Sequence, residues 1–205
     1  TYTREWAYFS SPEDGARETR GWFKVVPDYY LDEEGYDDDE DYWYYGDGDG
    51  NLYANEIRTI NGRKYAFDAY GRMMDGLRLV QFAPSNDEGT RFSTRDIVDS
   101  WDEDDSDIYP FETEDELDAT IATLMQEMGE NDSQYAFMYF GDEDDGAVKT
   151  GRQNITIDGE NFEFEFNDSG SRRGQGRNEL DDSDREAYAM GKRYEADSDN
   201  RYEII

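Results

Sequence analysis

The chain reads YWYYGDGDGNLY over residues 42–53 and YAFDAYGRMMDG over residues 65–76, a short aromatic run followed by an acidic turn that ends in glycine. Three more copies of this phrase begin at Trp6, Phe137 and Phe162. Aromatic runs favour pleated, half-buried strands, and clusters of Asp, Asn and Gly favour tight turns. Each copy therefore predicts a β-hairpin, and a lone hairpin must stack on neighbours to bury its aromatic face.

A phrase repeated at this frequency is typical of repeat architectures. We therefore expect a mainly β chain of tandem β-hairpin repeats, β-solenoid-like, interrupted by a small helical insert. The β-hairpin repeats are assigned to residues 1–82 and, in a divergent form, to residues 135–205. The acidic helical insert is assigned to residues 83–134, which contain no copy of the phrase.

The insert contains one strong helical pattern. Thr113 and Glu116 have the spacing of a capping box, and apolar residues then recur at helical spacing as far as Met128, before a natural C-cap at Gly129. We expect this helix to pack on the repeats, and the alternative is a helix that docks a partner through a face containing Met.

Three further segments have weaker signals. The stretch RDIVDSW at residues 95–101 predicts a second, weaker helical segment. The acidic runs at residues 32–41 and 102–107 predict solvated loops, because like charges at this density repel one another and resist burial.

Acidic residues dominate the composition: 53 Asp and Glu stand against 20 Lys and Arg, a formal net charge of −33. Aromatic residues nevertheless reach 16%, whereas disordered chains are poor in aromatics. The composition therefore predicts a folded protein with an aromatic core. Its charge argues against binding to nucleic acid or to anionic membranes, which attract basic surfaces. Adaptation to high salt is a further explanation of the acidity.

The absence of Cys and His excludes thiol nucleophiles, disulfides and His-based zinc sites. We expect no enzymatic activity, no cofactor and no metal site. The loop DGDGN at residues 47–51 lacks the Gly and Glu positions of an EF-hand, so it is interpreted as a hairpin turn, with a looser cation site as the alternative.

No apolar run is long enough to span a membrane, so membrane insertion is not expected. The chain opens within a copy of the phrase and lacks an initiator Met. We therefore expect it to be a fragment or processed segment of a longer protein.

The stretch INGRKYAFDAYGRMMDG at residues 60–76, together with Gly21-Trp22 and the WYY of residues 43–45, resembles the cell-wall-binding repeats of Gram-positive surface proteins. That family includes choline-binding modules and the repeat regions of large clostridial toxins. The resemblance covers residues 1–82 and 135–205. It implies a solenoid or chain of hairpins outside the cell, at the cell surface, with no catalysis of its own.

Choline-binding members of that family hold a quaternary ammonium group in a cage of aromatic rings, which is cation–π recognition. Carried over by motif, the resemblance implies a ligand-binding cage made of Trp22, Trp43, Tyr45, Tyr65 and Phe67. The alternative for each ring is packing in the hairpin core.

Three functional hypotheses follow. The first is a non-catalytic extracellular module that attaches a surface or secreted protein to the cell envelope, with a cell-wall polymer, a glycan or another surface protein as its partner. The second is a structural subunit of a surface layer or appendage, in which self-association is possible. The third is an acidic mimic of nucleic acid that blocks a DNA-binding protein.

Overall fold

The computed structural model of the protein describes residues 7–9, 20–30, 32–89, 91–101, 111, 113–127, 134–181 and 186–195. The helices are α1 (Glu33–Asp37) and α2 (Glu114–Glu127). The strands are β1 (Gly21–Val25), β2 (Tyr42–Gly46), β3 (Glu56–Ile60), β4 (Arg63–Phe67), β5 (Leu77–Pro84), β6 (Phe92–Trp101), β7 (Tyr135–Tyr139), β8 (Gly151–Ile157), β9 (Glu160–Phe166), β10 (Glu179–Asp181), β11 (Glu186–Ala189) and β12 (Lys192–Glu195).

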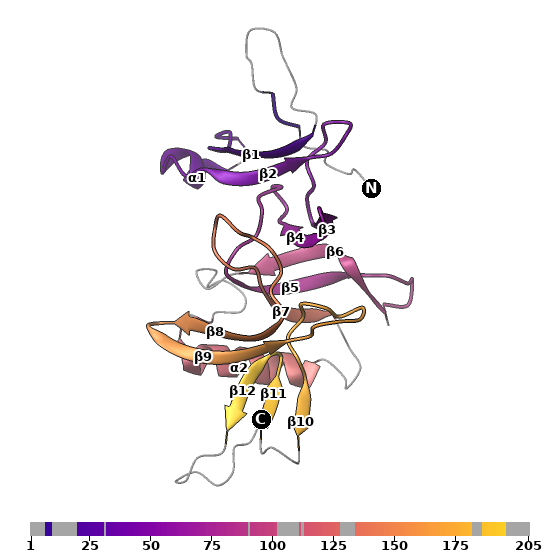
Figure 1. The fold of residues 1–205 in the computed structure, drawn as a ribbon, viewed down its shortest axis with the longest axis vertical. Coiled ribbons are helices and arrows are strands. Elements are labelled where there is room, and N and C mark those ends of the chain that lie inside the picture. The colour runs from indigo at the N-terminus through magenta and orange to yellow at the C-terminus, as the bar shows by residue number, and fades with distance from the viewer. Residues whose placement is uncertain are drawn as a thin grey trace.

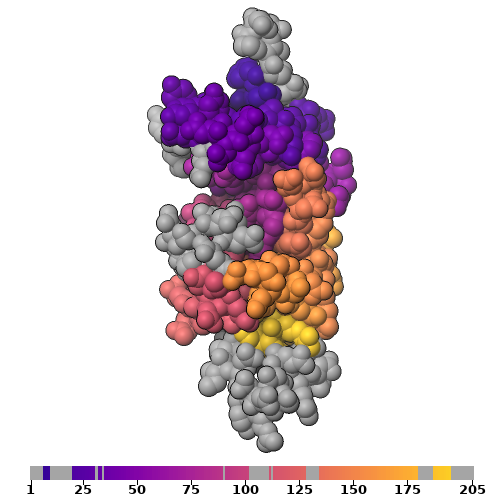
Figure 2. Space-filling view, turned by 90° about the vertical axis from the view of Figure 1, so that its left-hand side faces the viewer, coloured from indigo at the N-terminus to yellow at the C-terminus, as the bar shows by residue number. Residues whose placement is uncertain are grey.

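The described strands form three antiparallel sheets that follow one another along the long axis of the molecule (Figure 1), and the surface shows the same order from the indigo segments to the yellow ones (Figure 2). β1 and β2 form a two-stranded sheet, the middle sheet has the order β4-β3-β6-β5-β7, and the last has the order β10-β11-β12-β9-β8. The prediction of a mainly β chain with antiparallel hairpins is confirmed. The solenoid stays a prediction.

The acidic turns of the two best copies share one device. Asp47 Oδ1 accepts hydrogen bonds from the backbone N–H groups two and four residues further on, both at 2.8 Å. Asp68 Oδ1 accepts the same pair of bonds, both at 2.9 Å. A single β-bridge closes each turn, so the phrase is a strand with a tight turn, and its strand pairs with another segment: β2 with β1, and β4 with β3.

The predicted helix is confirmed as α2, and its capping box forms. The Thr113 N–H donates to Glu116 Oε2 at 3.2 Å, and the Glu116 N–H donates to Thr113 Oγ1 at 3.4 Å. Leu117, Ile121 and Leu124 are fully buried against the aromatic core of β7 and β9. Met128 and Gly129 lie outside the described residues, as do residues 102–107 and most of the copy that begins at Trp6.

The prediction of a helical segment in RDIVDSW was wrong, because these residues belong to strand β6. Ile97 pairs with Phe82 of β5, and its buried side chain lies in the core of the middle sheet. Side chains that branch at Cβ favour strands, and this preference outweighs the helical spacing of the few apolar residues in this short segment. β5 also runs across the predicted boundary between residues 82 and 83. The division into three zones stays a prediction.

The prediction of a solvated loop at residues 32–41 was wrong in part, because this segment contains helix α1. Asp32 anchors it: Asp32 Oδ1 accepts the Gly35 N–H at 3.1 Å, and Asp32 Oδ2 pairs with Arg72 Nη1 at 2.8 Å. A half-buried cation on a neighbouring turn thus holds the acidic run against the fold.

Candidate functional site

Strand alternation gives the β1–β2 sheet two apolar faces. In the register of this pair, Trp22 lies opposite Tyr45 and Phe23 lies opposite Tyr44. Because successive side chains point to opposite faces, Trp22, Trp43 and Tyr45 share the face toward β3 and β4, whereas Phe23 and Tyr44 share the other. We call these the inner and outer faces.

The five predicted cage residues all meet at the inner face. The ring of Trp22 lies 4.8 Å from that of Tyr65, 5.1 Å from Tyr45, 5.8 Å from Phe67 and 6.3 Å from Trp43, measured between centroids. Phe67 is fully buried and Tyr65 is 9% exposed.

Trp22 itself contacts the other four rings, edge to face with three of them and stacked on that of Phe67, as aromatic side chains pack in a core. Met73, Ile60 and Ala147 complete the cluster. The geometry is that of a hydrophobic core joining the first sheet to the second. Ligand binding by these five residues stays a prediction.

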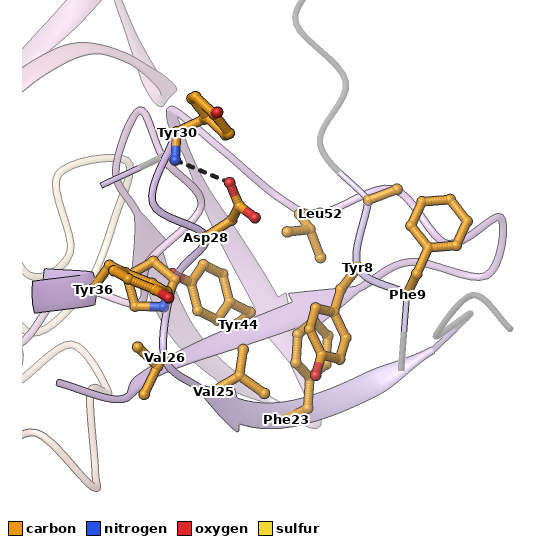
Figure 3. A pocket seen from close by; sticks show the side chains of 12 residues that line it. Tyr8, Phe9, Phe23, Val25, Val26, Asp28, Tyr30, Tyr36, Tyr44 and Leu52 are labelled. Atoms are coloured by element: carbon orange, nitrogen blue, oxygen red, sulfur yellow. Dashed lines mark hydrogen bonds between the residues drawn. The ribbon is translucent and has the colours of Figure 1, made fainter. Parts of the chain in front are cut away.

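The outer face carries an open pocket of about 610 Å³ (Figure 3). Its walls are mostly aromatic and aliphatic, and they come from β1, β2, the segment that leads into α1, α1 itself and residues 7–9. The lining residues are Ala7, Tyr8, Phe9, Phe23, Val25, Val26, Pro27, Asp28, Tyr30, Tyr36, Tyr44 and Leu52.

Three near-parallel rings form one wall of this outer-face pocket. Phe23 stacks on Tyr8 at 4.8 Å and 20°, and on Tyr44 at 5.8 Å and 14°. Other rings of the pocket are open to solvent: Tyr30 is 94% exposed and Tyr36 is 50% exposed. Burial raises the pKa of Tyr44 well above its ordinary value, so this phenol stays neutral at physiological pH.

An ionic network holds the wall made by residues 28–41. The Arg72 guanidinium pairs with Asp32 Oδ2 at 2.8 Å and Asp68 Oδ2 at 2.6 Å, and it lies 5.0 Å from the ring centroid of Tyr42 and 5.1 Å from that of Tyr70. Burial alone would lower the pKa of Arg72, but the two carboxylates outweigh it and raise the pKa. Arg72 therefore stays charged and joins the turn after β4 to the segment that leads into α1.

The pKa of Tyr42, which lies on β2 beside this network, is also raised. Burial, and then its hydrogen bond to Glu40 Oε2 at 2.5 Å, raise the pKa of Tyr42 to about 12. The phenol is therefore neutral throughout the physiological range, and it ionises only in strongly alkaline solution.

A second cavity, of about 460 Å³, lies beside β1 and β2, and acids dominate its rim. Lys24 sits among them, 3.4 Å from Asp41 Oδ1 and 3.6 Å from Asp144 Oδ1. Trp43 lines this cavity and donates from Nε1 to Asp144 at 3.2 Å.

In the described part of the chain, no group of three or more acidic, His or Cys side chains is placed to hold a metal ion. The acids at residues 47–51 instead cap their own turn. Among the described residues, no helix is long and apolar enough to cross a membrane.

The sequence predicted a binding site at the inner face and did not predict the pocket on the outer face. The signal was present, because GWFKV and YWYYG carry apolar or aromatic residues at both parities of the strand. A strand with one solvated face alternates apolar and polar residues. The lack of alternation therefore indicates that both faces are covered or that one of them binds a ligand.

No protein-family model and no curated protein matches the chain. Matches to solved structures include CbpJ from Streptococcus pneumoniae (TM-score 0.38, 18% identity, 85% of this chain and 52% of that chain). They also include CbpF in complex with ipratropium (0.36, 15%, 98% and 51%) and choline-binding protein F from Streptococcus pneumoniae (0.27, 16%, 93% and 44%). The chain spans about half the length of these structures. Similarity at this level does not establish a common fold or function.

Proposed function

We propose that this chain is a non-catalytic extracellular module that attaches a surface or secreted protein to a cell-envelope polymer or glycan through the outer-face pocket. The observation that carries the proposal is the open, aromatic-lined cavity on the β1–β2 sheet. Its volume of about 610 Å³ is within the range of ligand sites.

The chemistry of the walls favours a sugar over an anion. Ring faces such as that of Tyr30 offer flat apolar area to the C–H face of a sugar ring, and tyrosine hydroxyls offer hydrogen bonds at the edges. No lysine or arginine is among the described residues that line the pocket, and the chain carries a net charge of −33, so phosphate-rich polymers are disfavoured.

The non-catalytic part of the proposal is supported by the residues at hand. The chain has no His and no Cys, and in the part of the chain that the structure describes Asp28 is the one carboxylate that lines the pocket. Acid–base chemistry on a glycosidic bond normally uses two carboxylates that flank the scissile bond. A binding role therefore fits this pocket better than hydrolysis.

The proposal is tested by co-sedimentation with purified cell walls from a panel of Gram-positive bacteria. Tyr30→Ala removes an almost fully exposed ring of the pocket without disturbing the core, and Val98→Ala truncates a half-exposed side chain of β6 outside the pocket. We expect Tyr30→Ala to weaken sedimentation about two- to fivefold and Val98→Ala to leave it unchanged. Equal binding by both variants, or no binding by the unmodified chain, would refute the proposal.

A further inference from the structure

We propose that the outer-face pocket selects a glycan unit that carries a free, protonated amine, that is, a deacetylated amino sugar. This inference rests on the proposed function and names the ligand class of the same pocket. It requires two features of the pocket together: ring faces that accept a sugar, and a negative charge that meets the amine.

The first step concerns the sign of the charge. Of the described residues that line the pocket, Asp28 is the only one charged at neutral pH, since the others are tyrosines and apolar residues. Glu33, exposed on the same segment, adds negative charge, whereas Asp32 is already paired with Arg72. A cationic group therefore meets an attractive field in the opening, and an anion meets a repulsive one.

The second step concerns the placement of that carboxylate. Asp28 Oδ1 accepts the backbone N–H of Tyr30 at 2.9 Å. Figure 3 shows the Asp28 carboxylate between the Tyr30 ring and Leu52. The bond to Tyr30 fixes one oxygen, and the other oxygen can accept a hydrogen bond from an ammonium group beside the exposed ring.

The third step separates a protonated amine from related groups. The faces of Tyr30 and Tyr8 attract a cation, as in any cation–π site. An ammonium group also donates a charge-assisted hydrogen bond to Asp28. An N-acetyl group is neutral, so it brings no positive charge to this carboxylate. A sugar ring that stacks on Tyr30 can present its amine to Asp28, whose carboxylate is hydrogen-bonded to the backbone of Tyr30.

The test compares two trisaccharides by isothermal titration calorimetry: one of glucosamine, with free amines, and one of N-acetylglucosamine. We expect the free-amine trisaccharide to bind about tenfold more tightly at low salt and to lose this advantage as salt rises. Asp28→Asn is expected to weaken the free-amine ligand about two- to fivefold and to leave the acetylated ligand unchanged. The matched control Asp87→Asn, an exposed acid between β5 and β6, makes the same change of net charge and should alter neither.

Each other outcome counts against the inference. Equal affinity for the two trisaccharides, or equal effects of Asp28→Asn and Asp87→Asn, would overturn the amine selectivity while leaving glycan binding in place. If cell walls sediment in a Tyr30-dependent manner but neither trisaccharide binds, the proposed function stands and the amino-sugar inference falls. If trilysine binds as tightly as the glucosamine trisaccharide, the pocket recognises amines in general and not amino sugars.

Discussion

Removal of the Arg72 side chain tests the ionic network that holds the wall of the pocket. Arg72→Met keeps much of the length of the stem but removes the guanidinium. It leaves the carboxylates of Asp32 and Asp68, which are 12% and 17% exposed, close together without a countercharge. We expect a loss of free energy of unfolding and a loosening of the segment that leads into α1.

The magnitude follows from the contacts. Two charge-assisted hydrogen bonds are each worth about 1.5–3 kcal/mol, and two cation–π contacts add about 0.5–1 kcal/mol each. The cost of desolvating the half-buried guanidinium opposes these gains, and residual solvent around Arg72 screens them. The net loss expected on substitution is about 2–3 kcal/mol.

Urea denaturation followed by tryptophan fluorescence measures this loss, because Trp22 and Trp43 lie in the adjacent inner-face cluster. Arg95→Met is the matched control: Arg95 is mostly exposed and pairs with Asp96 at the surface, where solvent screens the pair, so its removal should leave the urea midpoint nearly unchanged. If Arg72→Met unfolds at the same urea concentration as Arg95→Met, the network does not hold the wall and the reasoning is refuted.

Two further predictions concern the helix cap and alkaline pH. Thr113→Ala removes the capping box of α2 and should lower the free energy of unfolding by about 1 kcal/mol. Thr113→Ser should keep most of the stabilisation, because serine also caps helices; equal losses in the two variants would contradict the role of the cap. The folded-state pKa of Tyr42 is raised to about 12. Its contribution to the free energy of unfolding is therefore fully present below the unfolded-state pKa of about 10 and is lost as pH rises through 12. Thermal melts should therefore show a smaller alkaline loss in Tyr42→Phe than in the unmodified chain, and identical losses would show that Tyr42 does not contribute.

Local chemistry made part of the fold predictable. The cap at Thr113 and the apolar spacing after it define α2, because a helix start depends on neighbouring residues alone. The acidic turns form as expected, since Asp47 bonds only within its own turn. Partners distant in sequence were not predictable: β5 pairs with β7, although β6 and α2 lie between them in the chain. The second strand expected after each of the two best acidic turns reduces to a single bridge.

The candidate site was also predictable only where its contacts follow from the motif itself. The motif grouped Trp22 with Tyr65 and Phe67 correctly in space, because all three belong to strands of adjacent hairpins. It could not predict that Arg72 would bind Asp32, 40 residues away, and draw the acidic run into the wall of a pocket. The sequence of a strand shows which of its side chains share a face. Which of the two faces stays open depends on the segment that packs on the other face.

Neighbouring residues on β1 separate the two roles of this sheet. Trp22 packs among four rings of the inner face, so Trp22→Ala should lower the free energy of unfolding by about 3 kcal/mol. Phe23 contacts only two of the outer-face rings, so Phe23→Ala should cost about 1–2 kcal/mol but remove the centre of the pocket wall. If the inner face were the binding cage, Trp22→Ala would abolish cell-wall binding at temperatures where the variant is folded, and Phe23→Ala would not. The opposite pattern is expected, because Trp22 is packed among the inner-face rings whereas Phe23 lines an open cavity.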